Sequence, residues 1–230
     1  MKKIFIACDT KDLKKIEKIL KHTKIKSNTF KIGYKFGLEF FYSQKGRSFI
    51  SKFKSDFIFL DLKINDIPNT AVEAIRSLKD LKRVKYITIH LNGGYEMIKA
   101  VKKETKKINK KIKILGVRVL TSLTNKSLKE LGYKKSIKDI VRKQALLAKK
   151  AKLDGVICSA NEAKFLKSIC NSMEIITPGI RLLGDRSHDQ KRITTPSEAF
   201  ANGATSIIVG RSITKGNVKK NLQKLINSLI

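Results

Sequence analysis

The sequence has little cysteine and proline, few acidic residues and no tryptophan. Its three cysteines, Cys8, Cys158 and Cys170, form no CxxC pair, which argues against a disulfide framework or a thiolate zinc site. An odd number of scattered cysteines suits a reducing compartment, so we expect a cytoplasmic protein. The three histidines are also too far apart in the sequence to indicate a metal site.

Long apolar runs and linker-like stretches are missing too. No stretch approaches the roughly 20 apolar residues that a membrane-spanning helix needs, so we expect no membrane partner. Only 13 glycines and 3 prolines occur, and they do not cluster. A chain of 230 residues that is 41% hydrophobic can build one large core, and we predict a single domain over residues 1–230.

Acidic residues are outnumbered, since 51 Lys and Arg against 19 Asp and Glu give a net charge of +32. Such an excess can indicate a nucleic-acid partner. Here the lysines are spread along the whole chain, with Ile and Leu between them, as on outer helix faces. No zinc-finger or RNA-recognition motif occurs. We therefore do not favour specific nucleic-acid binding, and a basic nucleic-acid-binding protein remains the non-enzyme alternative.

Short apolar runs alternate with longer amphipathic segments, as in a parallel sheet whose strands are buried on both faces. The expected strands are 4–7, 30–33, 57–62, 86–90, 112–119, 155–158, 174–177 and 206–209. The expected helices are 13–20, 36–53, 70–81, 94–108, 137–151, 160–165, 196–202 and 218–229. Eight such units predict a (β/α)8 TIM barrel. An open doubly wound sheet is less favoured, because no GxGxxG follows the first strand.

The most informative segment is Asp61-Leu62-Lys63-Ile64-Asn65-Asp66, directly after the apolar run Phe57–Leu60. In a TIM barrel, chemistry takes place at such C-terminal strand ends. Asp61 and Lys63 are two apart, which puts both on one face of a strand. A lysine between carboxylates stays protonated, so Lys63 indicates a proton donor. A structural ion-pair cluster at the barrel mouth is the alternative interpretation.

Two other polar residues lie in or after apolar runs. Lys31 lies within Phe30-Lys31-Ile32-Gly33, and because burying a lysine alone is costly, we expect it to pair with Asp61, Asp9 or both. A lysine that extends to solvent from a strand edge is the alternative. His90 ends the fourth expected strand, and a hydrogen-bonded core histidine explains it equally well.

An anion site is indicated near the end of the chain. The segment Thr177–Arg181 leads into a polar loop, and Gly210-Arg211 ends the eighth expected strand. Backbone N–H groups at such a turn, with an arginine beside them, form the usual phosphate site of a barrel. Arg211 is therefore a phosphate candidate rather than a surface arginine, and Arg186 and Arg192 are weaker ones. Thr70 with Glu73 fits a capping box, which explains Thr70 without a substrate.

With these residues in place, the sequence resembles the orotidine 5′-phosphate decarboxylase family from Asp9 to Arg211. An Asp-x-Lys-x-x-Asp motif alone is shared with sugar-phosphate decarboxylases and aldolases, whereas its continuation into Ile-Pro-Asn-Thr, followed by Thr-Pro-Gly-Ile-Arg and Gly-Arg, is specific. The segments that carry the resemblance are Lys31-Ile32-Gly33, Phe59–Lys63, Asp66–Thr70, Val119–Ser122, Leu153–Val156, Cys158–Ala160, Thr177–Arg181, Asp189-Gln190 and Gly210-Arg211.

The resemblance implies a carboxy-lyase that converts orotidine 5′-phosphate to UMP and CO2, the last step of de novo UMP synthesis, without metal or organic cofactor. Lys63 would donate the proton within a network of Lys31, Asp61, Lys63 and Asp66. The family's site is shared in a homodimer, with Asp66 and Thr70 from the second subunit. The other implied contacts are Asp9 with the ribose, Thr121, Ser122 and Pro178 with the pyrimidine, and Arg181, Gln190, Gly210 and Arg211 with the phosphate.

Three features depart from the family pattern. Ile64-Asn65 replaces a more familiar Phe-His, Lys35 stands where Glu is common, and the net charge is unusually positive. The alternative enzyme on the same scaffold is a metal-dependent 3-keto-gulonate-6-phosphate decarboxylase or hexulose-phosphate synthase.

Overall fold

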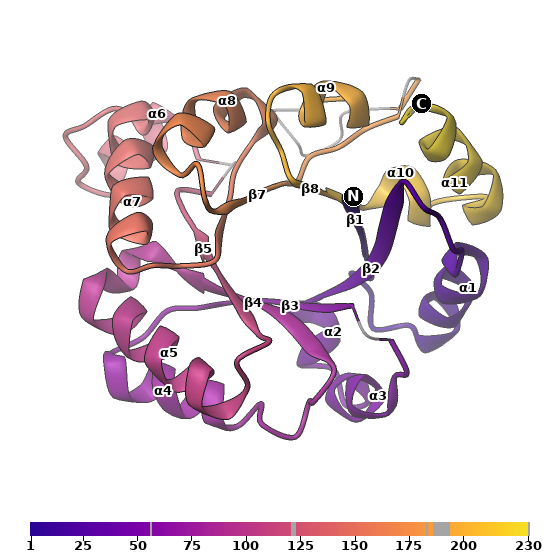
Figure 1. The fold of residues 1–230 in the computed structure, drawn as a ribbon, viewed down its shortest axis with the longest axis horizontal. Coiled ribbons are helices and arrows are strands. Elements are labelled where there is room, and N and C mark those ends of the chain that lie inside the picture. Colours follow the sequence, from indigo (N-terminus) through magenta and orange to yellow (C-terminus); the bar gives the residue numbers. More distant parts are fainter. Residues whose placement is uncertain (56, 121–122, 183, 186–193, 230) are drawn as a thin grey trace.

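The strands are β1 (Lys2–Ala7), β2 (Phe30–Gly37), β3 (Ile58–Ile64), β4 (Val84–His90), β5 (Lys113–Val117), β6 (Gly155–Ile157), β7 (Glu174–Thr177) and β8 (Ser206–Val209). In this computed structural model, which describes residues 1–55, 57–120, 123–182, 184–185 and 194–229, they form one closed parallel barrel in sequence order. Figure 1 shows the ring of strands with helices around it. The predicted (β/α)8 barrel is confirmed.

Amphipathic helices cover the outside of the barrel. In α11, for example, Val218, Leu222 and Leu225 are buried while the lysines between them are exposed, which is the spacing of a one-sided helix. The helices are α1 (Leu13–Thr23), α2 (Leu38–Phe41), α3 (Gly46–Lys52), α4 (Pro68–Arg76), the 3-10 helix η1 (Leu91–Gly93), α5 (Gly94–Ile108), α6 (Asn125–Glu130), α7 (Ile137–Lys150), α8 (Ala160–Ile169), α9 (Pro196–Ala201), α10 (Arg211–Thr214) and α11 (Val218–Asn227).

Aromatic side chains fill the inside of the barrel. The ring of Phe5 lies 4.8 Å from that of Phe57, 5.1 Å from Phe59 and 5.2 Å from Tyr86, measured between centroids. These rings belong to a buried cluster to which β5, β7 and β8 also contribute. The interior is therefore a packed core, and polar chemistry is confined to the ends of the barrel.

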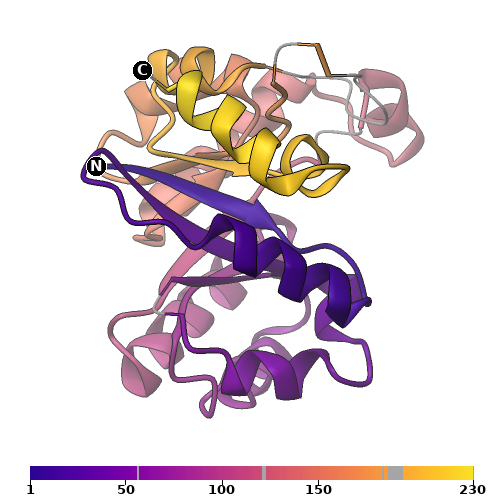
Figure 2. The same cartoon turned by 90° about the vertical axis from the view of Figure 1, so that its right-hand side faces the viewer.

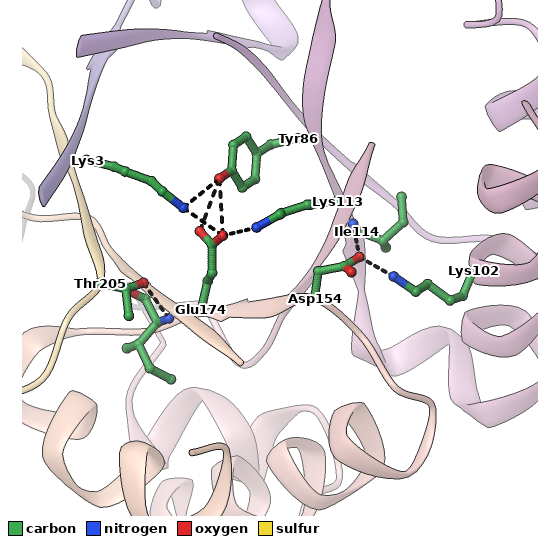
Figure 3. A network of polar contacts seen from close by, with 9 residues as sticks. Lys3, Tyr86, Lys102, Lys113, Ile114, Asp154, Glu174 and Thr205 are labelled. Carbon is green, nitrogen blue, oxygen red and sulfur yellow. Dashed lines mark hydrogen bonds and ion pairs between the residues drawn. The ribbon is translucent and has the colours of Figure 1, made fainter. Parts of the chain in front are cut away.

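An ion cluster closes the N-terminal end of the barrel (Figure 3). The carboxylate of Glu174 accepts hydrogen bonds from Lys3 at 2.7 Å, from the Tyr86 hydroxyl at 3.1 Å and from Lys113. Burial alone would raise the pKa of Glu174, but the hydrogen bonds and charges of Lys113 and Lys3 outweigh it and lower that pKa. Interactions at this end of a barrel serve stability rather than catalysis.

Several predicted element bounds differ from the structure, and two of the differences lie near the site. The segment predicted as one helix over 36–53 begins instead with the end of β2, and continues as α2 and α3. Helix α4 begins at Pro68, with Ile67 as its N-cap, because proline is well suited to the first helical position. Thr70 therefore lies inside the first turn, and the predicted Thr70–Glu73 capping box is wrong.

The two chain ends lie on the same side of the molecule (Figure 2). The Lys2 ammonium donates to the Leu229 carbonyl oxygen at 3.1 Å, so the beginning of β1 and the end of α11 are in contact. Among the described residues, no helix is long and apolar enough to cross a membrane.

Candidate active site

A pocket of about 600 Å³ lies at the C-terminal ends of the strands. It brings together many of the residues that the sequence indicated, because the C-terminal ends of parallel barrel strands meet at one rim. Its polar lining includes Asp9, Lys35, Asp61, Lys63, Arg118, Arg181 and Arg211, and its other lining residues include Val119, Pro178 and Gly210.

Acidic and basic side chains alternate along one wall of this pocket. The Lys35 ammonium lies 2.9 Å from Asp9 Oδ1 and 3.2 Å from Asp61 Oδ2. The other oxygen of Asp61, Oδ1, lies 3.0 Å from the Lys63 ammonium. Asp9, Lys35, Asp61 and Lys63 thus form a continuous array across β1, β2 and β3, which we call the charged array.

The predicted place of Lys31 in this network is wrong. Lys31 lies at the N-terminal end of β2, opposite Lys3 of β1, and its exposed ammonium is 4.9 Å from the centre of the Phe57 ring. Lys35, four residues further along the strand, points to the same face and is buried in the wall of the pocket. Lys35 counts as a departure from the family pattern only if Lys31 is taken as the lysine of the network, so that departure falls together with the Lys31 prediction.

Lys35 and Asp61 stay ionised although both side chains are largely buried. Burial alone would lower the pKa of Lys35, but the charges of Asp61 and Asp9 outweigh it and raise that pKa. Burial would likewise raise the pKa of Asp61, but the charges of Lys35 and Lys63 outweigh it and lower that pKa. Each carboxylate is therefore held by an ammonium, and each charge is fixed in position.

The backbone of β3 is distorted where Lys63 leaves it. Lys63 has φ +50°, which is unfavourable for a side-chain-bearing residue, and the pairing of β3 with β4 shifts register between Leu60 and Ile64. The fully buried Thr88 holds this turn: its hydroxyl oxygen accepts from the Lys63 backbone N–H at 2.9 Å, and its O–H donates to Asp61 Oδ1 at 3.0 Å. Local strain of this kind concentrates at functional sites.

His90 lies at the end of β4, beside the charged array. Its Nδ1 accepts from the Asn92 backbone N–H at 3.2 Å, as expected for a hydrogen-bonded histidine. Burial and the nearby charge of Lys63 lower the pKa of His90. A neutral imidazole that accepts at Nδ1 carries its proton on Nε2, so His90 adds no positive charge next to Lys63.

Two arginines mark the other end of the pocket. Arg181 follows β7 and is buried, and its Nη1 donates to the Ile180 carbonyl oxygen at 2.9 Å. Arg211 is exposed and begins α10, directly after Gly210. Both also line an adjoining hollow of about 270 Å³. The pocket is thus basic at this end, as a phosphate group requires.

Several predicted residues lie elsewhere. Thr121, Ser122 and Gln190, together with Arg186 and Arg192, lie outside the described residues. Asp66 and Thr70 are described and exposed, and neither lines the pocket of this chain. The Asp66 carboxylate accepts from the Ile67 backbone N–H at 2.7 Å. Their expected place in a partner's site stays a prediction.

Three residues of the site were missed from the sequence. Lys35 has a recognisable signal, since Lys35-Phe36-Gly37 repeats the Lys-x-Gly pattern of Lys31-Ile32-Gly33. Thr88 is a threonine inside an apolar strand, two residues before His90 and therefore on the same face. Arg118 has no comparable signal: it is almost fully buried, and it donates to the Ile157 carbonyl oxygen and to Glu162, both at 3.1 Å.

Comparison with known proteins agrees with this geometry. Residues 2–224 match the family model described as "Orotidine 5'-phosphate decarboxylase / HUMPS family". The orotidine 5′-phosphate decarboxylase of Carboxydothermus hydrogenoformans is 41% identical over 218 residues, which cover 92% of this chain and 88% of that protein.

Two solved structures have the same fold. The orotidine 5′-phosphate decarboxylase of Lactobacillus acidophilus superposes with a TM-score of 0.82 at 31% identity, over 100% of this chain and 99% of that one. The orotidine 5′-monophosphate decarboxylase of Methanocaldococcus jannaschii, in complex with the inhibitor BMP, gives a TM-score of 0.76 at 25% identity, with coverage of 100% and 99%.

Proposed function

Since the chain belongs to the orotidine 5′-phosphate decarboxylase / HUMPS family, we propose that it decarboxylates orotidine 5′-phosphate to UMP and CO2. The observation that carries this proposal is the charged array, with the Lys63 ammonium held 3.0 Å from Asp61 at the wall of the pocket. The two arginines supply the complementary charge for the substrate's phosphate.

The reaction needs a fixed positive charge at one carbon. Loss of CO2 from C6 of the pyrimidine leaves a carbanion that no ring carbonyl is placed to delocalise, so the site has to stabilise it electrostatically. The Lys63 ammonium can do this and then deliver its proton to C6. Asp61, itself held by Lys35 and Thr88, fixes the position of that ammonium before the substrate arrives.

Binding at the phosphate end supports the same reaction. Arg211 and Arg181 lie at the β7 and β8 side of the pocket, away from Lys63 of β3. Binding energy gained at a remote phosphate can be used to orient the ring carboxylate for loss of CO2. Asp9, at the end of β1, lies between the two regions in the barrel order and suits the ribose hydroxyls, while Pro178 of the β7 end suits the pyrimidine.

We further propose a homodimer in which Asp66 and Thr70 complete the partner's site. Both residues are exposed, and Ile67 between them has a side chain that is 67% exposed. Burial of this apolar surface against a second subunit would be favourable. A cytoplasmic location and a place as the last step of UMP synthesis complete the proposal.

The alternative is the metal-dependent chemistry of sugar-phosphate enzymes on the same scaffold. It requires carboxylates that are free to bind a divalent cation. In this pocket the Lys35 ammonium already lies between Asp9 and Asp61, at 2.9 and 3.2 Å. A second cation beside it would be repelled, so the charged array favours the metal-free decarboxylation.

An absorbance assay separates the two activities. The purified protein is mixed with orotidine 5′-phosphate, and loss of the orotidylate absorbance and formation of UMP are followed with and without EDTA. We expect turnover that the chelator does not change. Turnover that EDTA abolishes, or no UMP together with activity on a hexulose 6-phosphate, would overturn the proposal.

A further inference from the structure

The wall of the pocket formed by Val117–Leu120 begins at the last paired residue of β5 and continues past the sheet. Strand β5 ends at Val117, and the last pair in its register with β6 is Val117 with Ile157. The next backbone groups need other partners, because an unpaired buried N–H is costly. This wall, which we call the β5 wall, lies across the ring of strands from β1 (Figure 1).

One buried side chain supplies that partner. Gln144 of α7 is 8% exposed, and its Oε1 accepts from the Val119 backbone N–H at 3.0 Å. Its Nε2 donates to Asn92 Oδ1 at 2.7 Å. The orientation of the amide is fixed by chemistry, since the Val119 N–H can only donate and must face the oxygen.

The chain of hydrogen bonds continues to the proton-donor side of the pocket. Asn92 lies in η1, and its backbone N–H donates to Nδ1 of His90 at the end of β4. Three hydrogen bonds therefore join His90, Asn92, Gln144 and Val119 in series. Arg118, next to Val119, anchors the same wall to the end of β6 and to Glu162 of α8.

We propose that Gln144 is a positioning residue that holds the β5 wall against the pyrimidine end of the pocket and ties it to the end of β4. Gln144 does not line the pocket, so it acts through Val119. Its effect on nucleotide binding rests on the proposed function. Its effect on the wall itself does not.

The main variant is Gln144→Met, which keeps the volume and the helix propensity but removes both hydrogen bonds. The amides of Val117–Leu120 are expected to exchange with deuterium faster. Inhibition by UMP is expected to weaken about tenfold, as for the loss of one buried hydrogen bond. Inhibition by ribose 5-phosphate, which has no base, should change less than about twofold, because Arg181 and Arg211 follow β7 and β8 rather than β5.

Two further variants separate positioning from packing. Gln144→Glu still accepts from Val119, and the exposed Asn92 amide can turn to donate to it, so UMP inhibition should return close to that of the wild type. Asn92→Ala removes the side chain that accepts from Gln144 Nε2, and because Asn92 is exposed, the core stays intact. This variant should weaken inhibition by UMP, as Gln144→Met does.

The control is Thr205→Val at the opposite end of the barrel. The Thr205 hydroxyl accepts from the Ile175 N–H at 3.0 Å and donates to the Ile175 carbonyl oxygen at 3.1 Å (Figure 3). This variant should lower Tm and leave the ratio of UMP to ribose 5-phosphate inhibition unchanged.

Unchanged amide exchange in the β5 wall of Gln144→Met would overturn the inference, and so would equal weakening of the two inhibitors. If the wild-type protein does not decarboxylate orotidine 5′-phosphate, the proposed function fails, whereas the exchange measurement still decides whether Gln144 holds the wall.

Discussion

At the scale of single residues, the site depends on the lysine that lies between two carboxylates. Lys35 is nearly buried, with 7% of its side chain exposed, while Asp9 and Asp61 lie on either side of it. Removing it would leave the buried Asp61 with Lys63 as its remaining ammonium partner, and the Lys63 ammonium would lose its fixed position. Breaking a buried ion pair by removing one member is strongly unfavourable.

The predicted consequence is a contrast between two lysines of one strand. Lys35→Ala should lower kcat by about a hundredfold or more, as for loss of a preorganised group. Lys31→Ala should change kcat less than about twofold, because its exposed ammonium contacts only solvent and the Phe57 ring in the described structure. Steady-state kinetics of both variants provide the comparison, and equal losses would show that the charged array has been assigned to the wrong residues.

The sequence indicated most residues of the charged array. The error, which placed Lys31 in it instead of Lys35, has a physical cause. Asp61 and Lys63 stand out because charges follow a strand of large apolar residues, and their contact requires only the alternation of a strand. Lys31 and Lys35 each follow an aromatic residue and each precede an x-Gly pair, and they are four residues apart on one strand. Side-chain alternation places both on the same face, so only the length of β2 distinguishes them.

At the scale of elements, the order of strands was predictable and some ends were not. β7 and β8 begin and end as expected, because their apolar runs stop at polar residues or glycine. β2 runs four residues beyond the expected Gly33, because the sheet continues through Lys35, whose charge is neutralised by neighbouring strands. Sequence patterns do not report such tertiary compensation. The strained turn at Lys63 was equally invisible, since it depends on Thr88 of another strand.

Four strands are tied together by one carboxylate at the N-terminal end of the barrel. Glu174 of β7 holds Lys3 of β1 and Lys113 of β5, with Tyr86 of β4 above them. Because its folded-state pKa is lowered below the ordinary value of 4.5, its contribution to stability is present above that value. The contribution is lost as the pH falls through the lowered pKa.

Glu174→Gln should therefore destabilise the protein by about 2 kcal/mol at neutral pH, a value typical of hydrogen bonds to charged groups. Urea unfolding at neutral pH and at a pH well below 4.5 measures this difference, which should shrink in acid. Glu17→Gln, at an exposed position of α1, is the matched control and should be close to neutral at both pH values. A difference that grows in acid would contradict the assignment.

At the scale of the whole molecule, two features affect what the protein binds. They are its excess of basic residues and the proposed site shared between two subunits. The lysines are distributed over the outer helices, and the acidic residues are used in specific contacts such as the charged array and the Glu174 cluster. Most of the 51 Lys and Arg residues behind the charge of +32 lie outside the pocket. Their charge attracts anionic substrates in a salt-dependent way.

The proposed shared site can be tested by mixing subunits. Lys63→Ala and Asp66→Ala are each expected to be inactive as homodimers, because each lacks one component of both sites. After unfolding and refolding together, random pairing should restore about a quarter of the wild-type activity, since half of the dimers carry one intact site of two. Recovery is measured as UMP formation. No recovery, with dimers verified by sedimentation, would contradict a site shared between subunits.

The proton donor is the centre of the account, and Lys63→Ala tests it most directly. UMP formation from orotidine 5′-phosphate is compared between this variant and the wild type, with circular dichroism to verify the barrel and UMP binding to verify the pocket. We predict an intact fold, retained nucleotide binding and turnover lowered by at least about a thousandfold. Turnover within about tenfold of the wild type would contradict the assignment of Lys63.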